Sequence, residues 1–233
     1  MRLTPRYGSH SSVLGLLIGM KFGWSSTATV QTGVELMADY SAAEHGDPYL
    51  AEVRHTRELQ KTDPERYFRE VLALSDKGSV NAMARLAWAY HQGIGTDVDL
   101  SQAEQWYRRA WEAGSQQIFF YLGSLYWGQG KLAKVFEAYT AGAAANDQRC
   151  LYWLGWLYRD GLGVTRDRHK ARELFERSSS QGNLFARAAL AKLLMSGHFG
   201  IRSIFPGIFL YLRTLKEGYL ACLRNPACAD QWR

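Results

Sequence analysis

The chain has 233 residues, and 47% of them are hydrophobic, which is ample material for a folded core and argues against disorder throughout. Only five prolines occur, so long helices are permitted, whereas 22 glycines are many for a helical protein and need a positional explanation. The formal charge of +6 is uneven, because residues 149–233 contain 14 Lys and Arg against 6 Asp and Glu. A basic C-terminal part is compatible with acidic protein partners, anionic lipid or nucleic acid, and equally with a solvated surface.

The first 40 residues match none of the repeats described below, and we expect a separate segment that is flexible or used for targeting. Arg2 and Arg6 precede an apolar run, Val13 to Met20, which faintly resembles a signal peptide but is short and is stopped by Lys21. We expect a cytoplasmic protein, with a periplasmic or membrane-associated protein as the alternative if this run is a signal. Whether residues 1–28 are removed stays open.

A motif recurs along the middle of the chain: a leucine, a small residue, a tyrosine four residues after the leucine, and then Gly-x-Gly. Its copies begin at leucines spaced by 36, 32 and 36 residues, namely Leu86, Leu122, Leu154 and Leu190, of which the last begins a degenerate copy. Apolar residues at intervals of four share one face of a helix, and the small residue lets a partner helix approach closely. Glycine tolerates the left-handed conformation that ends a helix, so Gly-x-Gly predicts the end of the first helix of each unit.

A second pattern follows each motif and predicts a second helix. Asp99 and Asp167 stand where this helix begins and can cap its N-terminus. Alanine and aromatic residues then form an apolar stripe, and Gly114 and Gly182 end the helix. Upstream, residues 65–77 have the spacing of a second helix from an earlier unit, and residues 45–56 are its degenerate first helix. Stacked helix–turn–helix units of this kind bury a continuous core.

These residues resemble the Sel-one-like repeat (SLR) family, a tetratricopeptide-like helical family, over residues 65–218. The third copy carries the resemblance best, through Leu154, Gly155, Tyr158, Gly161, Gly163, Val164, Asp167, Lys170, Ala171 and Phe175. The resemblance implies an all-α fold, an α–α superhelix (solenoid) of four to five helix–turn–helix repeats spanning residues 41–218, followed by a tail, residues 219–233. It also implies a bacterial adaptor or scaffold protein, in signalling, secretion or envelope assembly, with no catalytic activity.

Aromatic and basic residues at matching offsets of the first helices predict a partner-binding groove. They lie away from the leucine–tyrosine face and exceed what the motif requires, and aromatic rings with arginine are typical of binding hot spots. Packing of these rings between adjacent units is the alternative. The candidate residues are Arg85, Trp88, Tyr121, Arg149, Trp153, Trp156 and Lys192.

The C-terminal stretch offers a second candidate surface. Its apolar residues recur at helical spacing with basic residues beside them, which is typical of a helix that docks on a membrane surface or on another protein, or of a cap helix packed on the last repeat. The residues that would contact a membrane are Ile201, Phe205, Ile208, Leu212, Arg213 and Lys216. No nucleic-acid motif accompanies the basic residues, so a nucleic-acid partner is disfavoured.

Motifs that carry chemistry are lacking in the sequence. There is no Gly-x-Ser-x-Gly elbow, no phosphate-binding loop and no His-Glu-x-x-His. Glu52 and His55 match one half of a di-iron ligand set whose second half is missing. The three cysteines are irregularly spaced, which favours free thiols, although Cys222 and Cys228 could pair in an oxidising compartment. We therefore expect no catalytic residue, cofactor or metal, and an enzyme is the second alternative.

Overall fold

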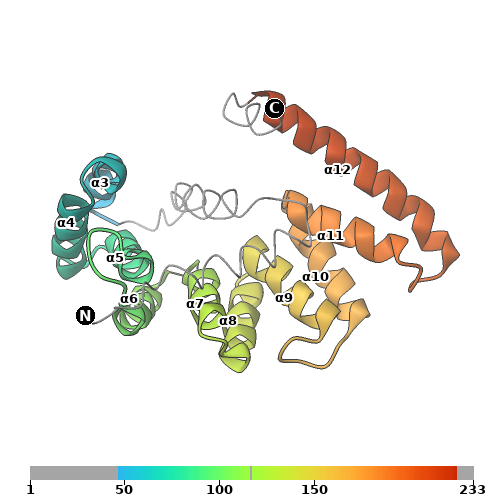
Figure 1. Ribbon diagram of the computed structural model, residues 1–233, viewed down its shortest axis with the longest axis horizontal. Coiled ribbons are helices and arrows are strands. Elements are labelled where there is room, and N and C mark those ends of the chain that lie inside the picture. Colours follow the sequence, from blue (N-terminus) through green and yellow to red (C-terminus); the bar gives the residue numbers. More distant parts are fainter. Residues whose placement is uncertain (1–46, 116, 225–233) are drawn as a thin grey trace, which may run out of the picture. The chain divides into compact units, whose positions relative to one another are not determined.

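The computed structural model describes residues 47–115 and 117–224, in which every regular element is helical. The described chain divides into two compact units, which join between Lys131 and Leu132. Unit 1 contains α3 (Leu50–Thr62), α4 (Pro64–Asp76), α5 (Val80–Gln92), α6 (Leu100–Glu112) and α7 (Ile118–Gly128) (Figure 1). Unit 2 contains α8 (Leu132–Ala144), α9 (Gln148–Asp160), α10 (Arg168–Ser180), α11 (Leu184–Met195), the short 3-10 helix η2 (Ile201–Ser203) and α12 (Ile204–Arg224). The expected N-terminal segment, residues 1–40, lies outside the described residues.

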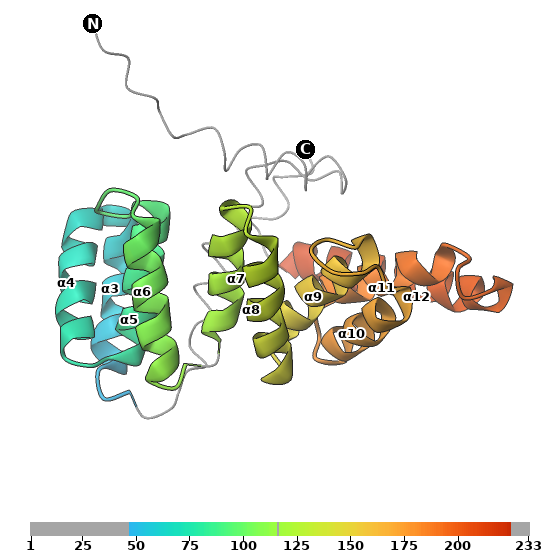
Figure 2. The ribbon, with the colours of Figure 1, turned by 90° about the horizontal axis from the view of Figure 1, so that it is seen from below.

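Consecutive helices pack on one another within each unit. In unit 1, α3 packs on α4, α4 on α5, α5 on α6 and α6 on α7; in unit 2 the same order runs from α8 to α12. Figure 2 shows the long axes of α3 to α6 running alongside one another. The odd-numbered helices are the first helices of the predicted repeats and the even-numbered helices are the second. The predicted all-α fold class of repeated helix–turn–helix units is thereby confirmed.

The second helices begin at a constant register. The helices α4, α6, α8 and α10 each have 13 residues, and their first residues are 36, 32 and 36 positions apart. The carboxylates of Asp63, Asp99 and Asp167 accept hydrogen bonds from backbone N–H groups in the first turns of α4, α6 and α10. The capping role of Asp99 and Asp167 was predicted, whereas that of Asp63, which has the same register, was missed.

Two of the Gly-x-Gly loops, those of Gly93 and Gly161, pack on the preceding repeat. Gly93 and Gly161 are left-handed and end α5 and α9, as the sequence predicts. The second glycines of these two pairs, Gly95 and Gly163, have a different role, because each lies against the second helix of the preceding repeat. A Cβ atom at Gly95 would stand 1.9 Å from the Pro64 carbonyl oxygen in the first turn of α4. A Cβ atom at Gly163 would stand 3.0 Å from Cβ of Leu132, the first residue of α8.

The two helices of a repeat approach closely where the sequence places small residues. In α9, a Cβ atom at Gly155 would lie 2.7 Å from the ring of Phe175, which is fully buried on α10. Phe175 and Ala171 join leucines of α11 in one hydrophobic cluster, against which Trp156 and Leu210 pack. Glycine at this position therefore permits the packing of α9 on α10 around a large ring.

The last helix departs from the pattern of the others. The helix α12 begins 36 residues after α10 but has 21 residues, and it continues through Gly218 and beyond residue 219. The boundary that we expected between the repeats and a C-terminal tail thus falls inside a helix. Gly207 takes the place of Ala171, 36 residues earlier, and packs against Met195, Ala191 and Leu194 of α11.

Candidate functional site

In unit 1, the predicted groove residues are packed inside the unit. Arg85, Trp88 and Tyr121 are all buried. The Trp88 ring meets the Tyr121 ring edge-on with centroids 5.9 Å apart, and Tyr121 stacks on Tyr107 at 6.0 Å. These rings therefore fill the space between α5, α6 and α7, which is the alternative of packing between adjacent units. They offer a partner little accessible surface.

The buried guanidinium of Arg85 has an unusual environment. It lies beside the phenol of Tyr67, which is hydrogen bonded to it; burial raises the pKa of Tyr67, and the cation of Arg85 opposes this rise. The Nε atom of Arg85 has no hydrogen-bond partner, and no carboxylate in the described part of the chain forms an ion pair with this residue. Arg85 is therefore held in the core largely by packing of its stem and by the phenol.

In unit 2, the same register positions reach the surface. Trp153 and Trp156 of α9 and Arg149 at its first turn are half-buried, and Lys192 of α11 is exposed. Trp153 stacks on Tyr139 and contacts the Trp156 ring, with centroids 6.4 Å and 6.3 Å away. Each indole therefore has one part of its ring supported by a neighbour and another part accessible.

Two basic residues of α9 are restrained by neighbouring side chains. The guanidinium carbon of Arg159 lies 3.6 Å from the centroid of the Trp156 ring, which is close enough for a cation–π contact. The same guanidinium forms an ion pair with Asp160, with Nη2 and Oδ2 2.8 Å apart. Arg149 forms an ion pair with Asp147, the N-cap of α9, at 2.9 Å. These ion pairs restrict the arginine side chains before any partner binds.

Sequence reasoning missed two residues of this surface, Tyr152 and Phe185, of which Phe185 is the more exposed. Phe185 lies in the first turn of α11, it is 53% exposed, and the centroid of its ring is 6.4 Å from that of Tyr152. The signal was present, because Phe185 is 36 residues after Arg149 and so occupies the same register position. We call this region the α9–α11 surface and define it as Arg149, Tyr152, Trp153, Trp156, Phe185 and Lys192.

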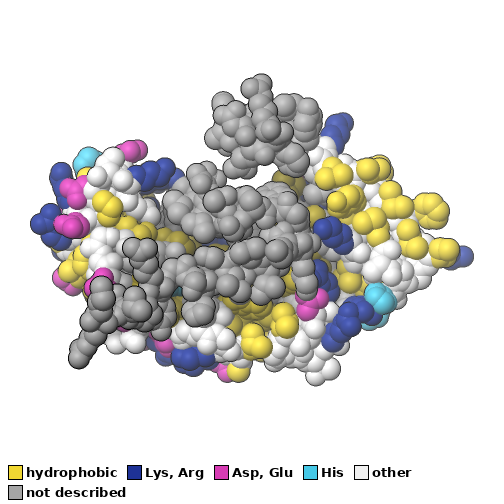
Figure 3. Space-filling view, in the orientation of Figure 1, with side chains coloured by type: hydrophobic (Ala, Val, Ile, Leu, Met, Phe, Trp, Pro, Cys, Tyr) yellow, Lys and Arg dark blue, Asp and Glu magenta, His cyan; other side chains and the backbone are white. Residues whose placement is uncertain are grey.

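The predicted membrane-contact residues gather on α12 and the turn before it. The side chains of Ile201, Phe205, Ile208 and Leu212 are exposed, and so are Arg213 and Lys216. Figure 3 shows hydrophobic side chains gathered over the part of unit 2 that α12 occupies in Figure 1. Among the helices described, none is long and apolar enough to cross a membrane.

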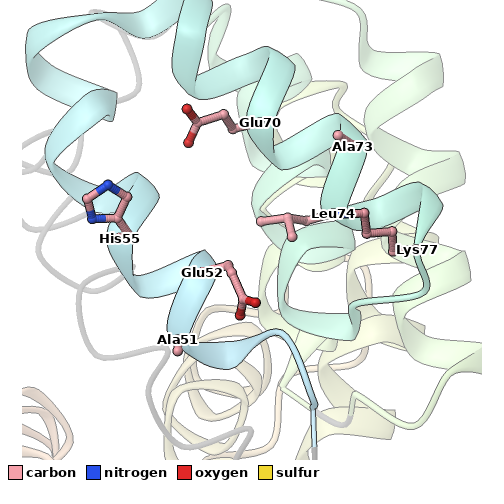
Figure 4. A pocket seen from close by; sticks show the side chains of 7 residues that line it. All are labelled: Ala51, Glu52, His55, Glu70, Ala73, Leu74 and Lys77. Carbon is pink, nitrogen blue, oxygen red and sulfur yellow. The ribbon is translucent and has the colours of Figure 1, made fainter.

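The remaining candidates for chemistry do not converge on a site. Glu52 and His55 lie with Glu70 around an open groove between α3 and α4, and their side chains are spread along it (Figure 4). Glu70 forms an ion pair with Arg66. No group of three or more His, Cys, Asp or Glu residues that could hold a metal ion occurs within residues 47–115 and 117–224. Cys150 is a buried free thiol whose pKa is raised by burial, and the side chains of Cys222 and Cys228 are outside the described part.

Comparison with known proteins agrees with the repeat assignment. The Sel1 repeat family model matches residues 80–115 and 148–183, which are the α5–α6 and α9–α10 pairs. A curated protein, the ERAD-associated E3 ubiquitin-protein ligase component HRD3 of Candida glabrata, is 26% identical over 102 residues; the match covers 42% of this chain and 12% of HRD3.

Two solved structures share the fold at a TM-score of 0.61. One is a Sel1 repeat protein from Oxalobacter formigenes, with 21% identity and 71% of each chain covered. The other is c5321, a protective antigen of uropathogenic Escherichia coli strains that displays an SLR fold, with 24% identity over 95% of this chain and 52% of that one. The chain thus spans about half of c5321 and a small part of HRD3.

Proposed function

Because this chain is a Sel1-like repeat protein, we propose that it is a non-catalytic adaptor that binds a protein or peptide partner through the α9–α11 surface. Proteins with Sel1 repeats generally act as scaffolds for protein interactions. HRD3 is by its name a component of an E3 ubiquitin-protein ligase, so a relative of this chain also works within a larger assembly.

One observation carries the choice of surface. The positions of the buried Asn81, Arg85 and Trp88 of α5 hold the half-buried Arg149, Trp153 and Trp156 in α9. Two of the three positions hold exposed residues in α11, Phe185 and Lys192. Tryptophan and arginine are enriched among the residues that dominate binding energy, and rigid rings lose little conformational entropy when a partner binds. Arg149, which is restrained by its ion pair with Asp147, similarly has less freedom to lose. The α9–α11 surface therefore has the composition and the order of a protein-binding site.

The proposal is tested by capturing partners from the source organism with the purified full chain. Captured proteins are then produced separately, and their dissociation constants are measured for the wild type and for Phe185→Ala, Trp153→Ala and Lys192→Glu. We expect Phe185→Ala and Trp153→Ala to weaken the binding of at least one partner by about tenfold or more, as hot-spot residues do.

Trp111→Ala is the matched control, because Trp111 is an exposed tryptophan of α6 in unit 1. Phe185→Ala should not affect folding, since this exposed ring contributes little to the core. Thermal melting confirms that each variant is folded. If every captured partner binds the three α9–α11 variants within about twofold of the wild type, which corresponds to less than about 0.5 kcal/mol, the α9–α11 surface is not the binding site.

A further inference from the structure

The outer face of α12 carries a stripe of exposed apolar side chains that the repeats do not use. Phe205, Ile208, Leu212 and Leu215 are 74%, 43%, 58% and 53% exposed. The opposite face of α12 packs on α11, where Gly207 permits close contact. A stripe of this size on a folded protein is typical of an interaction surface.

The same positions are charged on two earlier helices. Ile208 and Leu212 lie 36 residues after Arg172 and Glu176 of α10, which form an ion pair at 2.7 Å. Two repeats before α10, Glu104 and Arg108 of α6 occupy the same positions and form the equivalent ion pair at 2.9 Å. The fold therefore tolerates a charged pair at these positions, and α12 has an isoleucine and a leucine instead.

In the earlier repeats this face is where the next repeat packs. At the position of Ile208, Phe68 contacts the ring of Tyr90 and Phe136 contacts that of Tyr158, with centroids 5.2 Å and 5.8 Å apart. Glu104 at the same position accepts a hydrogen bond from the Tyr126 hydroxyl at 2.8 Å. Each tyrosine belongs to the first helix of the following repeat. The stripe on α12 is thus the continuation of the repeat-stacking interface, left open in the described chain.

We propose that this stripe binds the same stripe on a second copy of the chain, through an antiparallel pair of α12 helices related by a two-fold axis. The four residues are spaced by three, four and three positions, which is the spacing of a helix–helix seam. They are also symmetric about residue 210. In an antiparallel pair, Phe205 therefore lies opposite Leu215 of the second copy, and Ile208 opposite Leu212, so that apolar residues meet on both sides.

The charges beside the stripe fit this arrangement. Opposite Arg213 and Lys216 lie residues 207 and 204 of the second copy, so the cations of the two copies do not face each other. Glu217, at the end of the pair that faces the start of the other copy's α12, already forms ion pairs with Arg187 and Arg213 of its own chain, so it leaves no unpaired carboxylate at the seam. The interface is independent of the α9–α11 surface and goes beyond the adaptor proposal.

The test is the oligomeric state of the purified full chain, measured by sedimentation over a range of concentrations. One helix from each copy buries less than the roughly 800 Å² per partner of a standard interface, so we expect a reversible dimer that dissociates on dilution. The double variant Ile208→Glu, Leu212→Arg recreates the Glu104–Arg108 pair of α6 on α12 and should fold normally. We expect it to raise the dissociation constant of the dimer by about 100-fold or more, because apolar contacts at the centre of the interface are lost.

Val98→Glu is the control, since Val98 is an exposed apolar residue of unit 1, and it should leave the dimer unchanged. The antiparallel orientation is tested in a background with Cys222→Ser and Cys228→Ser. In a mixture of Phe205→Cys and Leu215→Cys chains, a disulfide should form between the two variants, and neither variant alone should cross-link efficiently.

Three outcomes would overturn the proposal. The first is a wild-type chain that stays monomeric at every concentration. The second is a dimer that the double variant retains or that Val98→Glu disrupts equally. The third is a monomer that binds vesicles of phosphatidylcholine and phosphatidylglycerol (about 7:3) and loses this binding in the double variant, which would make the stripe a membrane-contact surface.

Discussion

Replacement of Gly95 by alanine tests whether the Gly-x-Gly loops hold neighbouring repeats in register. The backbone of Gly95 has a φ of +69°, and so do Gly130 and Gly163. An alanine at any of these positions has the same left-handed strain of about 1 kcal/mol. The three sites differ in what the added methyl group meets: backbone at 1.9 Å for Gly95, a side chain at 3.0 Å for Gly163, and nothing within 4 Å for Gly130.

The expected cost follows from these distances. A methyl group 1.9 Å from the Pro64 carbonyl oxygen is not tolerated, so the loop or the first turn of α4 must move by more than about 1 Å. Such overpacking typically costs ~1–3 kcal/mol in addition to the backbone strain. We therefore expect Gly95→Ala to lower the free energy of unfolding by about 3 kcal/mol, and Gly130→Ala by about 1 kcal/mol.

The assay is urea denaturation of both variants and the wild type, followed by far-UV circular dichroism. Both glycines belong to unit 1, so their effects fall on the same unfolding transition. Hydrogen exchange should also show faster exchange in α4 and α5 for Gly95→Ala, because these helices meet at the altered contact. If the two variants lose the same free energy within about 0.5 kcal/mol, the contact between the loop and α4 does not stabilise the repeats.

Two further substitutions test other features of the fold. Gly163→Val should destabilise unit 2 by more than about 2 kcal/mol, since a β-branched side chain in left-handed backbone also meets Leu132; an unchanged melting temperature would contradict this. Burial lowers the pKa of His91 to about 4. Between pH 6.5 and 4, the imidazole of His91 is therefore protonated in the unfolded chain and neutral in the folded chain. The free energy of unfolding should accordingly fall by up to about 3 kcal/mol as the pH decreases from 6.5 to 4. His91→Gln should flatten the melting temperature over this range, and a wild-type profile that the substitution leaves unaltered would show that His91 is not the group responsible.

The sequence predicted the repeats well because their signals are local. Leucine and tyrosine spacing defined the first helices, and aspartate followed by an alanine–aromatic stripe defined the second helices. Glycine was a less reliable signal for the end of a helix at the C-terminal end of the array. Gly114 and Gly182 end their helices with φ of +99° and +94°, but Gly218 lies inside α12. Asn183 directly follows Gly182 and caps the next helix, α11, with its side chain, whereas helix-compatible apolar residues follow Gly218.

Exposure of the predicted groove residues could not be read from the sequence, because it depends on the neighbouring repeat. Trp88 and Trp156 occupy the same register position of α5 and α9. The ring of Tyr121 in the next repeat covers Trp88, whereas Ala189 stands at the place of Tyr121 beside Trp156. Whether the tryptophan side chain is buried or accessible therefore depends on the size of a residue more than 30 positions away in the sequence.

The side chain at one position of the first helices varies widely in chemistry while the helix itself is retained. One register position holds Arg85, Tyr121, Trp153 and Ala189 in four successive repeats, while the caps and glycines that set the helix ends lie elsewhere. A cation, a phenol, an indole and a methyl group are thus accepted at the same structural place. A new binding preference can therefore arise by substitution within one repeat, and duplication of a repeat supplies a further copy of that position on which selection can act separately.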